Sequence, residues 1–253
     1  MKKVFLFLVL TSIGFSIIFF SCKKDQPNLG NEDNETIAIE KYGEIHNEVL
    51  DLYYKKVGLK GTQSLDEKIK YIDECLSQVV DDIEEGSFAS IVNSNQFNVR
   101  SNIELISNSE NDFETGSIII NELYDNNQIT ENEREYYYTI LNTYEIYSSN
   151  LATLKVKLQE IENTILFDEL ITQFEKNNLL KVTSISISSV EYWELDTKNL
   201  TTKASIPSWI AKDCVGAVTS VQTGLTGYAT ILFGPVGGAI TTLGAAAVCS
   251  AIE

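Results

Sequence analysis

His46 is the only histidine in the chain, and it limits the chemistry that the sequence can perform. An HExxH site, a multi-histidine zinc site and an iron site with two histidines each need more than one imidazole ligand. The sequence also contains no G-x-S-x-G nucleophile elbow, no phosphate-binding P-loop and no G-x-G-x-x-G dinucleotide motif. We therefore expect no cofactor and no resident metal ion, and we assign no catalytic residue.

Three polar residues, His46, Asn47 and Asp51, are spaced to lie on one side of a helix. Asn47 and Asp51 are four positions apart, which is about one helical turn, and His46 borders the apolar residues Val49 and Leu50. Such residues either form a polar network that joins helices or provide a catalytic or ligand-binding group. Because His46 borders the apolar face, we favour a network in which it is hydrogen-bonded between helices.

The G-x-x-H-N-x-x-L-D string from Gly43 to Asp51 resembles a motif of uncharacterised helical proteins of Bacteroidota and Firmicutes. Those proteins also end in a Gly/Ala-rich segment that opens with Asp and Gly-Ala, as Asp213 to Ala217 does here. The resemblance covers two short parts of the chain and brings no activity with it. The function therefore has to be sought in other features of the sequence.

Residues 1–21 resemble the signal peptide of a bacterial lipoprotein. A short positive region and a charge-free run from Val4 to Phe20 precede Ser21-Cys22, and Phe19 stands where leucine is usual, as in Bacteroidota lipoproteins. The resemblance implies that the signal is cleaved and that Cys22 is acylated and becomes the first residue. The alternative for this run is an uncleaved anchor helix.

An acylated Cys22 would attach the protein stably to a membrane. Lys23 follows it, rather than the Asp that marks inner-membrane retention, so we expect the outer membrane, with the periplasmic or surface-facing leaflet undecided. Residues 22–36 are polar, carry Pro27 and Gly30, and are typical of a flexible tether. The expected partners are the lipid bilayer, through Cys22, and an envelope protein of unknown identity.

The charge balance excludes nucleic-acid binding. The chain has 19 basic and 36 acidic residues, and without the two signal-peptide lysines the mature chain has 17 basic residues and a net charge of −19. Binding to DNA or RNA needs Lys and Arg side chains that replace the counterions of the phosphates. The two arginines of the chain, Arg100 and Arg134, are too few to form a phosphate-binding cluster.

Residues 37–203 are predicted to form a helical body. Capping boxes at Ser64–Glu67 and Thr130–Glu133 each open a segment whose apolar residues recur at alternating intervals of four and three. The second pattern runs to Ile165, as expected for one long helix. Residues 179–193 fit a strand as well as a helix, and with no partner strand in the sequence we assign a helix. We therefore predict an all-α helical bundle.

The helix that begins after Ser64 is predicted to end at Gly86, because glycine is the usual residue just beyond a helix. Its acidic residues, Asp73 among them, fall opposite the apolar side. We expect them to form a face exposed to solvent.

Residues 204–253 differ in composition from the body, since no charged residue occurs from Cys214 to Ile252. Gly-Pro-Val-Gly-Gly at 234–238 predicts a turn between two helical arms. Small residues recur along both arms, which lets helices approach closely. The arms resemble the glycine-zipper helices of membrane-active peptides, so we predict a small-residue helical hairpin.

The cysteines suggest one disulfide. Once Cys22 is acylated, three cysteines remain in an exported compartment, which permits at most one pair. Folding the two arms antiparallel brings Cys214 and Cys249 to the same end of the hairpin, so we expect a disulfide between them, with two buried free thiols as the alternative. Cys75 lies beside the apolar residues of its helix and is expected to be a buried thiol.

The leading functional hypothesis is a non-enzymatic outer-membrane lipoprotein with a structural or interaction role in the envelope. The alternative is a membrane-active, bacteriocin-like protein whose hairpin at residues 204–253 inserts into a target bilayer. The many Asp and Glu residues leave a carboxylate-based hydrolase open, although no motif points to it.

Overall fold

The computed structural model describes the following residues: 37–58, 63–94, 97–196, 206–221, 225, 229, 232 and 237–251. The chain divides into two compact units, Met1–Asn34 and Glu35–Glu253, and all described residues belong to the second. The predicted signal peptide, the lipidation site Cys22 and the tether up to residue 36 therefore lie outside the described residues.

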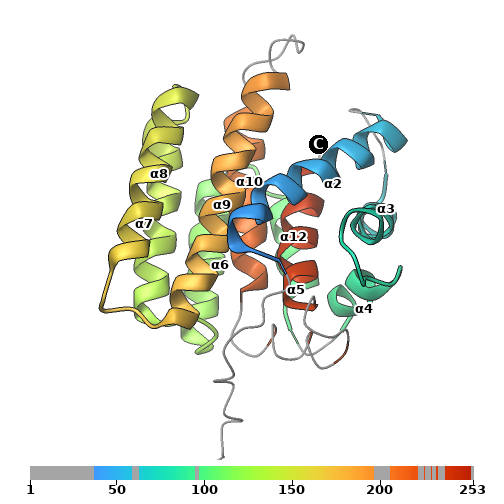
Figure 1. Ribbon diagram of the computed structural model, residues 1–253, viewed down its shortest axis with the longest axis horizontal. Coiled ribbons are helices and arrows are strands. Elements are labelled where there is room, and N and C mark those ends of the chain that lie inside the picture. The colour runs from blue at the N-terminus through green and yellow to red at the C-terminus, as the bar shows by residue number, and fades with distance from the viewer. Residues whose placement is uncertain are drawn as a thin grey trace, which may run out of the picture. The chain divides into compact units, whose positions relative to one another are not determined.

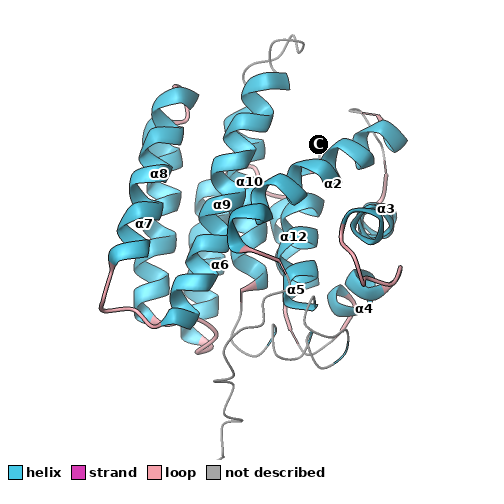
Figure 2. Cartoon of the chain, viewed as in Figure 1, coloured by secondary structure: helices cyan, strands magenta, loops and turns pink. Residues whose placement is uncertain are grey.

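The described residues form helices and connecting turns, with no strand among them (Figure 2). The prediction of an all-α helical bundle is confirmed, and residues 179–193 are helical as expected. The elements are η1 (Ile39–Lys41), α2 (Tyr42–Val57), α3 (Leu65–Val79), α4 (Ser87–Val92), α5 (Val99–Ser107), α6 (Asp112–Asp125), α7 (Glu131–Tyr147), α8 (Leu151–Phe167), α9 (Gln173–Asp196), α10 (Ile206–Ser220) and α12 (Gly237–Ser250).

Local hydrogen bonds explain where several helices begin. Both predicted capping boxes are present, at Ser64–Glu67 before α3 and at Thr130–Glu133 before α7. A third box, Thr172–Glu175, begins α9, where the Glu175 N–H donates to Thr172 Oγ1 at 3.2 Å. Thr130 Oγ1 also donates to Glu175 Oε1 at 2.6 Å, so the starts of α7 and α9 are joined.

The single long helix predicted from Thr130 to Ile165 is divided into α7 and α8. α7 ends at Tyr147, and the Asn150 side chain accepts a hydrogen bond from the Thr153 N–H at 3.0 Å to begin α8. The 4-3 spacing continues through the turn because the apolar side of each helix is buried in the same core. The two helices lie side by side at one edge of the bundle (Figure 1).

The end of α3 differs from the expectation. α3 ends at Val79, and Gly86, with a φ of 98°, begins α4 instead. Asp73 is buried rather than exposed, and its carboxylate accepts hydrogen bonds from the N–H groups of Gly86, of Phe88 at 2.7 Å and of Ala89 at 3.2 Å. A carboxylate from α3 thus caps α4, an arrangement that depends on a contact between two helices and not on the sequence of either one.

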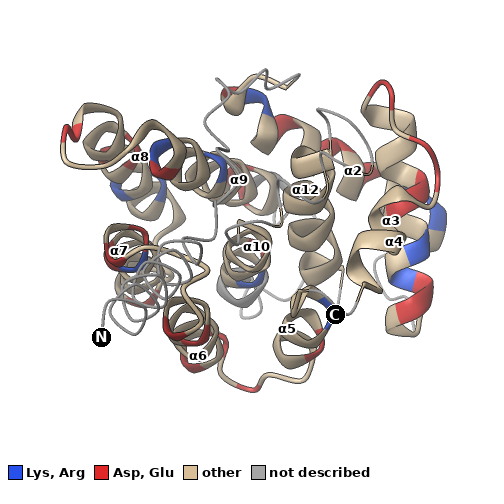
Figure 3. Cartoon of the chain, turned by 90° about the horizontal axis from the view of Figure 1, so that it is seen from below, with Lys and Arg blue, Asp and Glu red and all other residues tan. Residues whose placement is uncertain are grey.

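The centre of the bundle is formed by α10 and α12. α12 packs against α10, α2, α3, α4 and α5, while α10 also packs against α5, α6, α7 and α9 (Figure 1). Charged residues lie on the surrounding helices and none lies on α12 (Figure 3). Every residue of α12 is buried, and one hydrophobic core includes residues of both helices and of the surrounding ones. α12, the second arm of the predicted hairpin, therefore lies inside the bundle, whereas Leu232 before it is 49% exposed.

Candidate functional site

Two motifs that are far apart in the chain meet at a buried contact between His46 on α2 and Asp213 on α10. His46 Nε2 lies 3.8 Å from Asp213 Oδ1, and neither side chain is exposed to solvent. α9 packs against both α2 and α10 and completes the site. The sequence singled out both segments, but nothing in it predicted that these two residues would meet.

Groups on α9 hold the Asp213 carboxylate. Its Oδ2 accepts hydrogen bonds from Ser189 Oγ at 2.6 Å and from Trp193 Nε1 at 3.3 Å. Burial raises the pKa of Asp213, and His46 together with these hydrogen bonds opposes the rise because each favours the ionised form. Asp213 Oδ1 accepts no hydrogen bond from a described residue. The contact with His46 Nε2 therefore offsets the cost of burying this oxygen.

The other side of the His46 ring determines where its protons lie. Asn47 Nδ2 donates to the Ser188 carbonyl at 3.0 Å, so Asn47 Oδ1 faces His46 Nδ1 at 3.1 Å and accepts a hydrogen bond from its N–H group. A neutral ring would then present a lone pair on Nε2 to Asp213 Oδ1. Two facing acceptors repel each other, so we infer that one proton lies between them, on the imidazole or on the carboxyl group.

Close backbone approach joins α2 to α9 beside this pair. The Gly43 N–H donates to Ser184 Oγ at 3.1 Å, and a Cβ at position 43 would lie 2.0 Å from Ser188 Oγ. Any larger residue would therefore force the helices apart. Asp51, at the end of the same motif, is exposed and accepts a hydrogen bond from Tyr192 Oη at 3.1 Å. His46 and Asn47 thus belong to one buried network, whereas Asp51 makes a separate contact with α9.

This geometry favours a structural role for His46. Ser189 is hydrogen-bonded to Asp213 rather than to the imidazole, so the three side chains do not form a nucleophile–base–acid relay. All three are buried, and a substrate cannot reach them in this conformation. What the arrangement can do is hold α2, α9 and α10 together through polar contacts inside an apolar core.

Cys214 and Cys249 are free, buried thiols, which differs from the disulfide expected between them. α10 and α12 do approach closely, because a Cβ at Gly216 would lie 2.8 Å from Ala245 O and 2.9 Å from Cys249 Sγ. Two residues correspond to about 200° around a helix, so Cys214 points away from the side of α10 that meets Cys249. Cys75 is also a buried free thiol.

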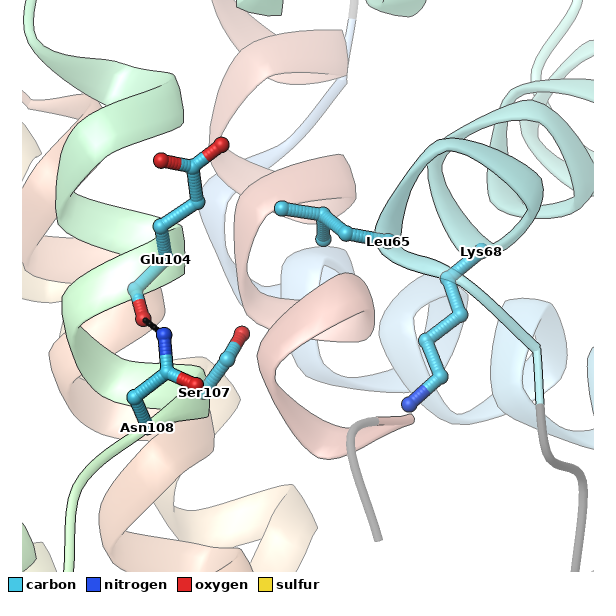
Figure 4. A pocket seen from close by; sticks show the side chains of 5 residues that line it. All are labelled: Leu65, Lys68, Glu104, Ser107 and Asn108. Carbon is cyan, nitrogen blue, oxygen red and sulfur yellow. Dashed lines mark hydrogen bonds between the residues drawn. The ribbon is translucent and has the colours of Figure 1, made fainter.

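A cavity of about 300 Å³ lies between the start of α3 and the end of α5 (Figure 4). The Lys68 side chain extends from α3 on one side, and α5 and the residue after it form the other side. The lining residues are Leu65, Lys68, Glu104, Ser107 and Asn108. Lys68 was not predicted as a site residue. The signal was its spacing, three residues after Leu65 and four before Ile72, which places a lysine on the apolar side of α3.

The turn between α8 and α9 exposes large apolar side chains. Phe167 is 81% exposed and Leu170 is 88% exposed, and two further apolar residues flank them. Asp168 and Glu169 lie between these two in sequence, so acidic groups border the apolar ones. We call these four residues, Leu166, Phe167, Leu170 and Phe174, the apolar turn. The available signal was the continuation of apolar residues beyond Ile165, where the 4-3 pattern stops.

Comparison of the chain with protein-family models, with curated proteins and with solved structures found no match in any of the three. Within the described ranges, no helix is both long enough and apolar enough to cross a membrane. In the same ranges, no group of three or more His, Cys, Asp or Glu side chains is placed to hold a metal ion.

Proposed function

We propose that the protein is a non-enzymatic, outer-membrane-anchored lipoprotein that binds another protein of the cell envelope. The observation that carries this proposal is the apolar turn, since covering large apolar side chains with a partner removes them from water. Phe167 and Leu170 would be the anchors of the contact. The buried position of His46 and Asp213 supports interaction over catalysis as the role of the body.

The charge around the apolar turn defines the partner's chemistry. Asp168 and Glu169 border the apolar side chains, and the mature chain carries a net charge of −19. A partner surface with an apolar centre and a rim of Lys and Arg matches this arrangement. An anionic lipid surface does not, and membrane attachment is already supplied by the proposed acylation of Cys22. The apolar turn is therefore assigned to a protein and not to the bilayer.

The test is crosslinking in the native envelope, followed by purification of the full-length protein and its crosslinked partner. The double variant Phe167→Ser/Leu170→Ser removes the two most exposed side chains of the apolar turn. The matched control, Ile146→Ser/Val156→Ser, removes two other exposed apolar side chains, on α7 and α8. We expect the same partner with the wild type and the control, and at least a tenfold lower yield with the turn variant.

Two further measurements sharpen this test. The crosslinks of the wild type should map to residues of the apolar turn. The same pair, purified without crosslinking, should dissociate more readily as the salt concentration rises. A partner that is retained equally by the turn variant would show that binding uses another surface.

A membrane-active role for residues 204–253 is the second candidate, and its support is the absence of charge from Cys214 to Ile252. Because α12 is buried on all sides, insertion would first require the bundle to open. Leakage of dye from liposomes exposed to the full-length protein would support this candidate. Intact liposomes, tested with bilayers of several compositions, would eliminate it.

A further inference from the structure

Lys68 is a buried cation whose ammonium group has no hydrogen-bond acceptor and no carboxylate partner among the described residues. Its side chain lines the cavity between α3 and α5, although the residue is only 7% exposed. Burial and the neighbouring Lys212 both lower the pKa of Lys68, burial more strongly. Lys68 also lies in the first turn of α3, where the helix dipole disfavours positive charge.

The carboxylates of Glu104 and Asp112 already have cationic partners. Glu104 Oε1 accepts a hydrogen bond from Arg100 Nε at 3.0 Å, and Asp112 Oδ1 lies 4.0 Å from Lys212 Nζ. Within the described part of the chain, no acidic oxygen lies within 4.0 Å of Lys68 Nζ. Three unfavourable influences therefore act on a lysine that receives no counter-charge from these residues, which indicates that the counter-charge comes from a ligand.

We propose that this cavity binds a small organic anion that carries one carboxylate and a short apolar chain. The carboxylate accepts hydrogen bonds from the Lys68 ammonium group and from Asn108. One Asn108 Nδ2 hydrogen donates to the Glu104 carbonyl at 2.8 Å, which leaves the second hydrogen for the ligand. Leu65 provides an apolar wall for the chain of the ligand (Figure 4).

The charge of the ligand follows from the lining of the cavity. One unpaired ammonium group matches one negative charge, and the Glu104 carboxylate lines the same cavity and disfavours a dianion such as phosphate. A cavity of about 300 Å³ is at the lower end of the size range of small-molecule sites, in agreement with a short chain. This site is separate from the apolar turn and does not depend on the proposed partner.

The test is calorimetric titration of the full-length protein in detergent with hexanoate, hexylammonium and inorganic phosphate. We expect saturable binding of hexanoate, no binding of hexylammonium and weaker binding of phosphate. Lys68→Met keeps the apolar stem and removes the charge, so it should weaken hexanoate binding at least tenfold. Lys70→Met, on the same helix with a side chain that is 68% exposed, is the matched control and should bind like the wild type.

A second variant and a stability measurement test the same cavity independently. Asn108→Asp places a further carboxylate in the lining of the cavity and should also weaken hexanoate binding at least tenfold. In the absence of ligand, Lys68→Met should raise the thermal midpoint, because a buried charge without a partner is removed. Equal hexanoate binding by Lys68→Met, a preference for phosphate, or a lower thermal midpoint of the empty Lys68→Met protein would each overturn the proposal.

Discussion

Trp193 Nε1 donates a hydrogen bond of 3.3 Å to Asp213 Oδ2, and the indole ring packs edge-on against Tyr54 and Tyr192. This one residue of α9 therefore connects the buried pair of His46 and Asp213 to an aromatic cluster between α2 and α9. We therefore expect a substitution of His46 alone or of Asp213 alone to lower the free energy of unfolding.

Replacing one member of the pair should be costly, whereas replacing both should not. His46→Leu or Asp213→Leu leaves the other group buried without its partner, and we expect each to lower the free energy of unfolding by about 3–5 kcal/mol. The double variant should lose much less than the sum of the two. Urea unfolding followed by circular dichroism measures all three, and additive losses would show that the two groups do not interact.

Gly43→Ala should destabilise the contact between α2 and α9. The new Cβ would lie 2.0 Å from Ser188 Oγ and 2.5 Å from the Ser184 carbonyl oxygen, so the helices must move apart. We expect a loss of about 1–3 kcal/mol in the free energy of unfolding. Glu44→Ala, at the exposed neighbouring position, is the control and should change stability by less than about 0.5 kcal/mol. Equal stability of the two variants would contradict the close packing at Gly43.

The three cysteines that follow Cys22 should be unreactive in the folded protein. Burial raises the pKa of Cys75 to about 11 and that of Cys214 to about 12, and it raises the pKa of Cys249 as well. Very little thiolate is then present at pH 8, and access is blocked. A thiol reagent should label these cysteines only after denaturation, whereas recovery of a peptide that links Cys214 to Cys249 under non-reducing conditions would contradict the free thiols of the structure.

The cost of burying Lys68 should depend on pH. Because its pKa is lowered in the folded state, the unfolded chain holds this proton more tightly, and the folded state gains relative stability as the pH rises toward the ordinary lysine value. Without ligand, Lys68→Met should therefore be more stable than the wild type at pH 7, and this difference should shrink at pH 10. Urea midpoints of both proteins at the two pH values measure the effect. A stability difference between the two proteins that grows with pH would show that folding does not lower the pKa of Lys68.

The proposed anchor predicts a specific covalent structure. Intact-mass analysis of the protein from membranes should find a mature chain that begins at Cys22 and carries two or three acyl chains. Cys22→Ser should remain unprocessed, because the acylated residue is lost. A mature wild-type form without lipid would remove the anchor from the proposed function.

Features that depend on local hydrogen bonds could be predicted from the sequence. The capping boxes at Ser64 and Thr130 needed only residues three positions apart, and Thr172 could have been found by the same pattern. The break after Tyr147 could not be seen in the spacing of apolar residues, because α7 and α8 both bury their apolar sides in the same core. The signal was instead polar, in the Ser-Ser-Asn sequence that precedes Leu151.

The candidate sites were harder to predict because they depend on which helices become neighbours. His46 could be assigned to a polar network, but its partner Asp213 lies on a helix that is distant in sequence. Asp73 was expected in solvent and instead caps α4, since the turn after α3 returns the chain over it. Lys68 was visible as a lysine among apolar residues, yet only the structure shows that it lines a cavity between α3 and α5 and that no described residue pairs with its charge.

The contact between Tyr54 Oη and the carbonyl of Ser250, at 3.1 Å, joins the first long helix to the last one, 196 positions away. The centre of the protein is thus made of α10 and α12, which are synthesised after the helices that surround them. Until α12 has been released, the sides of α2, α3, α4 and α5 that pack against it remain uncovered. Such distant pairing favours slow folding, in which α12 joins the other helices late. The growing chain would have to be kept from aggregating for most of that time.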